Sequence, residues 1–376
     1  MALDNIIVFA LYSPTGGEDS QARLALEVVR SSLGLSFLVT YAARIFRAIS
    51  KTYNGWPMCY SARVRQNLKH LSRRYEAEVD WAAFEELYRR RAVGEDIKMS
   101  RDLQRNFQNP ETDVERRTSE YIAQFLKAKR SEWENGVFAQ RRRVAEAEKA
   151  LAKRETKKAR EDIRIGTKKA QEFLDRLADL RRTESNNEDA RIFPLSYAPV
   201  LMSEEDRRVI KPMRYTCRLA GKPSDAEKRF PGIYNARRDS LDDYWRAVYG
   251  RKHAVIVISG FYENVPEHLY QHRELAPDEK EKNLVLEFDP KPARDMLVAC
   301  LWDHWSQPGK PSLDSFAAIT DEPTPEVAAT GHQRTIITIQ EEDLSAWLRP
   351  ESQSRDRLGQ ILSEKDIPYY IHQVAA

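Results

Sequence analysis

Four short segments of the sequence hold residue types that can act as a nucleophile, as an acid–base group or as an anion binder. They are Met58-Cys59-Tyr60-Ser61-Ala62, Tyr234-Asn235-Ala236-Arg237-Arg238, Gly260-Phe261-Tyr262-Glu263-Asn264 and Gly331-His332-Gln333-Arg334. A cysteine thiolate attacks electrophilic carbon, and a glutamate or histidine side chain can move protons. Taken singly, each segment has a simpler explanation, because lone cysteines usually pack in cores and the other residues are common at surfaces and turns. Any shared chemistry therefore depends on the fold that brings them together.

The first element that would position these segments is helical. Residues 58–110 have a helical pattern in which Trp81, Phe84, Leu87 and Tyr88 form one apolar face.

Strands dominate the second half of the chain. From Arg191 onward, short β-branched or aromatic runs are bounded by Pro, Gly or Asp. These runs are Ala254–Ile258, Leu284–Phe288, Met296–Trp302, Phe316–Thr320 and Thr335–Ile339. Only Leu241–Tyr249 and Glu342–Leu348 have a helical pattern among them. Strands without alternating helices predict an α+β fold, with a twisted, largely antiparallel sheet flanked by helices.

Residues 111–185 differ in composition from both regions, since they are rich in Lys, Arg, Glu and Ala with apolar residues at helical spacing. They predict a long charged helix or a helical hairpin, with a break near Gly136 or Gly166. The interleaved acidic residues favour a solvated arm over a basic surface for DNA. The three consecutive arginines Arg141–Arg143 keep the second alternative open.

Composition and cysteine usage exclude several classes of protein. The apolar fraction of 41% supports a folded core, and the net charge of +3 restricts any nucleic-acid surface to a local patch. The three cysteines Cys59, Cys217 and Cys300 form no CxxC pair, so we expect no disulfide framework and no structural zinc site. No other metal and no cofactor is expected either. This sparse usage fits a reducing cytoplasm.

Neither a membrane span nor a secretory signal is expected. The apolar stretch Leu33–Ile49 contains two arginines and is too short and too charged to cross a bilayer. A secretory signal has lysine or arginine before its apolar run, and here neither residue precedes the first apolar run.

Together and in this order, the four segments resemble the SOS response-associated peptidase family, whose members process abasic sites in DNA. The family pattern has Met-Cys at the initiator, then Asn-Ala-Arg, then Gly-Phe-Tyr-Glu, and then a histidine after a strand. Lys211-Pro212-Met213-Arg214-Tyr215 is also similar to a Pro-Met-Arg-Trp element of the family, with Tyr215 in place of Trp. The resemblance covers roughly residues 58–350. It divides the chain into an extension, residues 1–57, and one domain, residues 58–376, with a helical insertion at 111–185.

The resemblance implies covalent capture of abasic sites in single-stranded DNA. An opened abasic sugar carries an aldehyde, and an N-terminal cysteine offers an α-amine and a thiol two carbons apart. The amine forms an imine, and the thiol then closes a thiazolidine ring. Carried onto this sequence, Cys59 is the nucleophile and Asn235 orients its amine. Glu263 is the general acid–base group, and His332 exchanges a proton with the sugar oxygen.

The resemblance also implies a set of DNA-binding residues. Arg237 and Arg214 would hold flanking phosphates, Tyr215 would stack on an unpaired base, and Thr320 aligns with a threonine of the family site. The expected partner is single-stranded DNA with abasic sites, with no membrane. Contacts of the insertion with the replication machinery are a further possibility.

The position of Cys59 inside the printed chain conflicts with this chemistry. Translation starting at Met58 would expose Cys59 after methionine removal, and self-cleavage after Met58 would do the same. If residues 1–57 are retained, crosslinking is lost. We favour the first explanation because the resemblance begins abruptly at Met58.

The same site could also have lyase or crosslink-reversal activity. Two other functions stay open. A cysteine peptidase would use Cys59 with His332 and Glu263 on other polypeptides. A non-catalytic DNA-binding scaffold would depend on residues 111–185 instead.

Overall fold

The computed structural model describes residues 61–375 of the chain. The chain divides into two units, residues 1–56 and 57–376, and every described residue belongs to the second. Within residues 61–375, no helix combines the length and the apolarity needed to cross a membrane.

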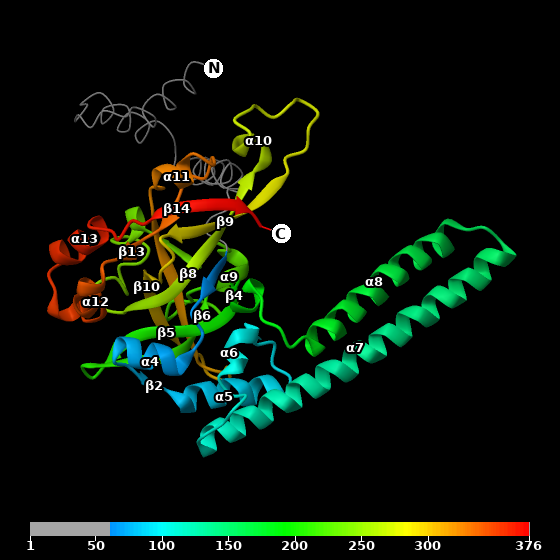
Figure 1. Ribbon diagram of the computed structural model, residues 1–376, viewed down its shortest axis with the longest axis horizontal. Helices are drawn as coiled ribbons and strands as arrows, with labels where there is room; N and C mark the ends of the chain where they lie inside the picture. The colour runs from blue at the N-terminus through cyan, green and yellow to red at the C-terminus, as the bar shows by residue number, and fades with distance from the viewer. Residues whose placement is uncertain (1–60, 376) are drawn as a thin grey trace, which may run out of the picture. The chain divides into compact units, whose positions relative to one another are not determined.

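A single twisted sheet forms the centre of this unit (Figure 1). Its strands are β1 (Ser61–Val64), β2 (Glu78–Val79), β3 (Lys98–Met99), β4 (Arg191–Ile192), β5 (Ser196–Glu204), β6 (Arg207–Tyr215), β7 (Asn235–Arg237), β8 (His253–Pro266), β9 (Asn283–Lys291), β10 (Met296–Trp305), β11 (Leu313–Asp321), β12 (Thr335–Ile336), β13 (Thr338–Ile339) and β14 (Tyr369–Val374). Four of the five strand runs predicted from the sequence lie within single strands, and the fifth, Thr335–Ile339, is divided into β12 and β13 at Ile337.

Five of the strands close on themselves. The order β10-β11-β6-β5-β8 is completed by pairing of β8 with β10, so no edge is left within this ring. Most pairings are antiparallel, and the exceptions among the described strands are β6–β11, β7–β11, β2–β6 and β3–β5. The predicted α+β class with a largely antiparallel sheet is therefore confirmed.

Helices cover the sheet and extend from it. They are α4 (Leu68–Tyr75), α5 (Trp81–Ala92), α6 (Arg101–Arg105), α7 (Asp113–Lys153), α8 (Lys157–Arg181), α9 (Ala226–Arg229), α10 (Glu267–Tyr270), α11 (Pro325–Ala328), α12 (Leu344–Leu348) and α13 (Arg355–Ser363). The predicted apolar face of α5 is confirmed, since Phe84, Leu87 and Tyr88 are buried. The predicted helix at Leu241–Tyr249 is wrong. That segment folds as successive turns, which still bury Leu241 and Trp245 in the core.

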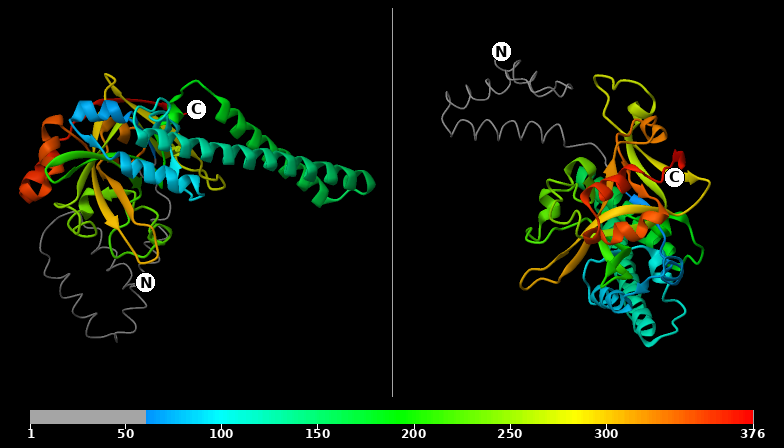
Figure 2. Two further views of the ribbon diagram at one scale, coloured as in Figure 1. Left: turned by 90° about the horizontal axis from the view of Figure 1, so that it is seen from below. Right: turned by 90° about the vertical axis from the view of Figure 1, so that its left-hand side faces the viewer.

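The charged segment forms a helical hairpin, α7 and α8, that extends away from the sheet (Figures 1 and 2). Helix α7 begins at a capping box in which Thr112 and Glu115 exchange hydrogen bonds with each other's backbone. The predicted break at Gly136 or Gly166 is wrong, because both glycines lie inside helices. A Cβ at Gly136 would stand 2.7 Å from the ring of Phe173, and one at Gly166 would stand 2.7 Å from Val144. These glycines allow α7 and α8 to approach closely.

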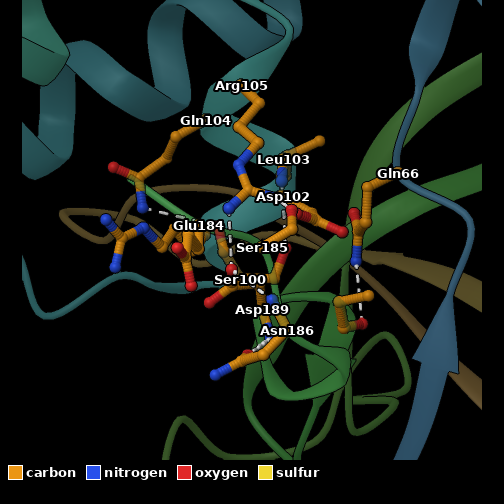
Figure 3. A network of polar contacts seen from close by, with 12 residues as sticks. Gln66, Ser100, Asp102, Leu103, Gln104, Arg105, Glu184, Ser185, Asn186 and Asp189 are labelled. Atoms are coloured by element: carbon orange, nitrogen blue, oxygen red, sulfur yellow. Dashed lines mark hydrogen bonds and ion pairs between the residues drawn. The ribbon is translucent and has the colours of Figure 1, made fainter. Parts of the chain in front are cut away.

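An ion-pair network fixes the base of the hairpin (Figure 3). Asp189 is 5% exposed and accepts hydrogen bonds from Arg105 at 2.7 Å and from Arg182 at 3.0 Å. Burial acts to raise the pKa of Asp189, but the bonds from Arg182 and from the Asn186 N–H outweigh it and lower that pKa. A carboxylate held this way joins the end of the insertion to α6.

The strand β8 starts at a buried histidine that makes stability depend on pH. His253 lies against Trp347, accepts a hydrogen bond from the Gly250 N–H and donates one to the Trp347 carbonyl. Burial lowers the pKa of His253 from 6.5 to about 3. The folded chain therefore keeps it neutral where the unfolded chain binds a proton, so its contribution is complete above pH 6.5 and is lost as the pH falls toward 3.

We expect the free energy of unfolding to fall by about 1.4 kcal/mol per pH unit over this window through His253 alone. Urea unfolding between pH 7 and pH 4 measures the slope. The variant His253→Gln should be less stable at pH 7 yet show a shallower slope. An equal slope in both proteins would assign the acid sensitivity elsewhere.

Candidate active site

Strand β8 and the turn after α11 bring a carboxylate and an imidazole together. Glu263 lies near the end of β8 and is fully buried, and His332 is 6% exposed. The turn requires glycine, because Gly331 has φ of +88° and a Cβ there would stand 2.8 Å from the Leu269 side chain. The next strand, β12, begins three residues after His332 and pairs with β11, which fixes the far side of the turn.

Glu263 and His332 lie within hydrogen-bonding distance of each other. Nε2 of His332 lies 3.3 Å from Oε2 of Glu263, and Nδ1 lies 2.7 Å from the Arg334 carbonyl oxygen. The Arg334 N–H also lies 3.3 Å from Nδ1, and Nε2 faces the carboxyl group. A proton between Nε2 and Oε2 satisfies both atoms. The pair can therefore give or take one proton in a buried setting.

The described chain begins beside this pair. Ser61 is opposite Tyr262 in the β1–β8 ladder, and Tyr262 directly precedes Glu263. Arg191 donates a hydrogen bond to the Ser61 hydroxyl at 2.9 Å, and its guanidinium lies 3.7 Å from the centre of the Tyr262 ring. The predicted nucleophile Cys59 lies outside the described residues.

The other two cysteines are unsuitable as nucleophiles. Cys217 and Cys300 are both fully buried, and burial raises the pKa of each thiol well above its usual value. A thiol in this state is almost never the reactive thiolate. Among residues 61–375, no group of His, Cys, Asp or Glu side chains has an arrangement that could hold a metal ion.

Asn235 is placed by β7, which pairs in parallel with β11. It is 4% exposed, and its Oδ1 accepts a hydrogen bond from the Tyr215 hydroxyl at 3.3 Å. The Tyr215 ring is 5% exposed, stacks on Phe316 at 5.3 Å and meets Tyr234 edge-on at 5.7 Å. Tyr215 therefore contacts a site residue from within the core, and a base could stack on its ring only if this packing opened.

Two arginines flank one carboxylate at the rim of the site. Arg237 donates to Asp239 at 3.0 Å, and Arg334 approaches the same carboxylate at 3.5 Å. The hydrogen bond from Arg237 lowers the pKa of Asp239. The guanidinium groups of Arg237 and Arg334 thus both lie beside the Asp239 carboxylate. Arg334 follows His332 by two residues in a segment already singled out, but its type alone gave no signal.

Arg214 is engaged elsewhere. It ion-pairs with Glu227, which also accepts from Arg218 at 2.7 Å, and the Arg214 side chain is 14% exposed. A contact with phosphate would require Arg214 to leave this pair.

Thr320 lies on β11, between β7, which carries Asn235 and Arg237, and β12, which follows His332. Its register partners are Arg237 on β7 and Ile336 on β12. The side chain is fully buried, and its hydroxyl makes no hydrogen bond to any residue in the 61–375 range.

A second polar layer behind the site escaped the sequence analysis. The Tyr262 hydroxyl donates to Glu287 at 2.8 Å, and Arg63 forms an ion pair with the same carboxylate at 2.8 Å. These contacts join β1, β8 and β9 beside Glu263. The partners are more than twenty residues apart in sequence, so no local pattern could have indicated them.

Comparison with solved structures finds distant similarities. A protein from Bacteroides thetaiotaomicron is 14% identical, with 50% of this chain and 78% of that chain covered and a TM-score of 0.40. A protein from Bordetella bronchiseptica is 16% identical, with 52% and 90% covered and a TM-score of 0.39. A phage-related protein from the same organism is 15% identical, with 52% and 85% covered and a TM-score of 0.37. No curated protein matches the sequence.

The sequence profile of the family described as SOS response associated peptidase matches residues 149–376, which is more than half of the chain. The matched region contains Asn235, Glu263 and His332 and begins within α7, so it does not include Cys59. The chain therefore belongs to the SOS response associated peptidase family, and this membership supports a function associated with DNA damage.

Proposed function

We propose that this protein captures abasic sites in single-stranded DNA through a thiazolidine bond to Cys59, which acts as the N-terminal residue. The observation that carries the proposal is the buried contact between Glu263 and His332. Cys59 precedes Ser61 by two residues, a connection of at most about 7 Å, and Ser61 pairs with the residue next to Glu263. This connectivity supports a role for Cys59 beside the proton-transferring pair.

The chemistry needs one proton donor and one proton acceptor in sequence. The α-amine adds to the sugar aldehyde, and the resulting hydroxyl must be protonated to leave as water and give the imine. The thiol must then lose a proton, its sulfur attacks the imine carbon, and the imine nitrogen takes a proton. Aldehyde and aminothiol thus become thiazolidine and water. A pair that holds one proton, such as Glu263 and His332, can supply each transfer in turn.

Recognition of DNA around the lesion is assigned to the rim. Arg237 and Arg334 place two guanidinium groups close together at Asp239, and a guanidinium group can bind a phosphate with two hydrogen bonds. Asn235 would donate its amide N–H groups toward the amine of residue 59, since its oxygen accepts from Tyr215. For Tyr215 we propose this orienting role ahead of base stacking, because its ring is packed on Phe316.

The test uses a chain prepared to begin at Cys59 and a single-stranded oligonucleotide with one abasic site. We expect a heat-stable shifted band on a denaturing gel, with an adduct mass equal to protein plus DNA minus one water. An oligonucleotide with a reduced abasic site lacks the aldehyde and serves as the control. Absence of the adduct from the chain beginning at Cys59 would overturn the proposal. Mass spectrometry of the protein purified from its native host shows whether the mature chain starts there.

The hydrogen bond from Tyr215 to Asn235 gives a smaller prediction. Tyr215→Phe keeps the stacking on Phe316 and removes only the hydroxyl. Loss of one such bond is worth about 0.5–1.5 kcal/mol, so we expect the crosslinking rate to fall about 2- to 10-fold. Single-turnover rates on the abasic oligonucleotide measure this. An unchanged rate would show that Asn235 does not depend on Tyr215 for its orientation.

A further inference from the structure

The far end of the α7–α8 hairpin concentrates positive charge that the rest of the chain lacks. Residues 141–169, here called the hairpin tip, contain twelve Lys and Arg against five Asp and Glu, a net charge of +7. The whole chain carries only +3, so everything outside the tip carries −4. The first part of α7, residues 113–140, has five basic and five acidic residues. The positive field is therefore a property of the tip and not of the whole arm.

Most of these cations are not neutralised by the protein. Arg143, Arg160 and Arg164 pair with acidic residues of the tip itself. The other nine are exposed and make no ion pair within the part of the chain that the structure describes. They are Arg141, Arg142, Lys149, Lys153, Arg154, Lys157, Lys158, Lys168 and Lys169. A cluster of unpaired, exposed cations attracts a polyanion.

The spacing of these residues places several of them in rows. Arg142, Lys149 and Lys153 are separated by seven and four residues, so they lie on one side of α7. Lys157 and Lys168 lie eleven residues apart and share one side of α8 in the same way. Each row is about 16 Å long, a length over which a DNA strand presents several phosphates.

The hairpin tip lies far along α7 from the end that contacts the rest of the chain. Arg142 is 29 residues from the start of α7, a distance of about 44 Å along the helix. Asp189 anchors the base of the hairpin, and Arg117 of α7 pairs with Glu85 of α5 at 2.9 Å. The close approach at Gly136 and Gly166 keeps the two helices together along their length. The tip is therefore a separate surface on a well-supported arm.

We propose that the hairpin tip binds the phosphate backbone of DNA that flanks the lesion, without reading its sequence. The choice of DNA as the polyanion rests on the proposed function. A membrane surface is a poorer partner, because an interfacial helix needs an exposed apolar face. Here Val144 packs against Gly166, and Ala147, Ala159 and Ala170 are buried.

The experiment compares two variants with equal loss of charge. The tip variant is Lys149→Gln/Lys153→Gln/Lys157→Gln/Lys158→Gln. The control variant is Arg116→Gln/Lys127→Gln/Arg130→Gln/Arg181→Gln, four exposed positions nearer the base of the hairpin. Glutamine preserves helix propensity in both. Each protein is titrated with single-stranded DNA of about 40 nucleotides and of about 8 nucleotides over a range of salt concentrations.

We expect the tip variant to bind the long DNA at least 10-fold more weakly at low salt, with a log–log salt slope reduced by about 3. The control variant should change the slope by less than half as much. An unchanged slope for the tip variant would overturn the inference, and so would equal losses in both variants.

Crosslinking of a short abasic oligonucleotide separates this inference from the proposed function, because the tip variant should crosslink it at the parental rate. If no protein crosslinks the oligonucleotide while the salt slope still depends on the tip, the proposed function fails and the tip surface stands.

Discussion

We expect a chain that begins at Cys59 to form a heat-stable complex with abasic single-stranded DNA, and Cys59→Ser in the same chain to abolish it. The serine variant keeps the α-amine, so it still forms an imine with the sugar aldehyde. It lacks the sulfur that closes the stable ring, and the imine is hydrolysed on heating. Borohydride reduction before heating should trap the serine adduct as a secondary amine. Denaturing gels with and without the reductant measure both species.

The chain that starts at Met1 provides the complementary test. It keeps the thiol of Cys59, but the nitrogen of residue 59 is an amide and cannot form an imine. We expect no heat-stable band from this chain and no band after reduction. The chain beginning at Cys59, its Cys59→Ser variant and the chain starting at Met1 thus distinguish the contribution of the α-amine from that of the thiol. A heat-stable adduct from the chain with an acylated Cys59 nitrogen would contradict the thiazolidine and point to a different bond.

The sequence indicated two residues that the fold brings together, but not the contacts around them. Glu263 and His332 were selected through the family resemblance, and the structure places their side chains 3.3 Å apart. Their separation of 69 residues is bridged by sheet pairing, which no local pattern encodes. The second polar layer, Arg63 with Glu287 and Tyr262, consists only of such distant pairs and was missed.

Two central strands were missed for a local reason. Strands β5 and β6 contain Pro199 and Pro212, and proline within a run argues against a central strand. The structure places the two prolines directly opposite each other in the ladder. The two residues that lack a backbone N–H are therefore paired with each other, and the residue pairs on either side maintain the register of β5 and β6.

The glycines of the hairpin were misread because glycine has two uses in helices. As a helix breaker, Gly136 or Gly166 would have ended α7. In the structure each glycine contacts a side chain of the other helix. Phe173 lies against Gly136 and Val144 lies against Gly166, both so close that a Cβ on the glycine would clash. The turn instead lies at residues 154–156 between α7 and α8. Only the partner helix reveals which use applies.

Glu263→Gln, in a chain beginning at Cys59, should slow crosslinking by about 10²- to 10⁴-fold, the usual contribution of general acid–base catalysis. Glutamine has nearly the same shape as glutamate, so the packing of this fully buried side chain is retained. The amide cannot release or accept a proton at the pH of the reaction. Single-turnover rates of the variant and the parent, compared at each pH between 5 and 9, measure the loss.

A matched control removes a buried carboxylate that is not in contact with His332. Glu287→Gln loses its ion pair with Arg63 and leaves the Glu263–His332 contact in place. We expect its folded fraction to crosslink within a few-fold of the parental rate. A loss as large as that of Glu263→Gln would mean that any buried charge defect at this end of β8 disables the site.

The double variant Glu263→Gln/His332→Gln decides whether the two side chains act as one unit. If they share a proton, removing either partner already removes the transfer, and the second substitution adds little. The rate of the double variant should then lie within a few-fold of the slower single variant. Independent roles would multiply instead, since two separate losses of 10²-fold or more would combine to at least about 10⁴-fold. A rate near that product would assign Glu263 and His332 to different steps and leave their 3.3 Å contact as a structural one.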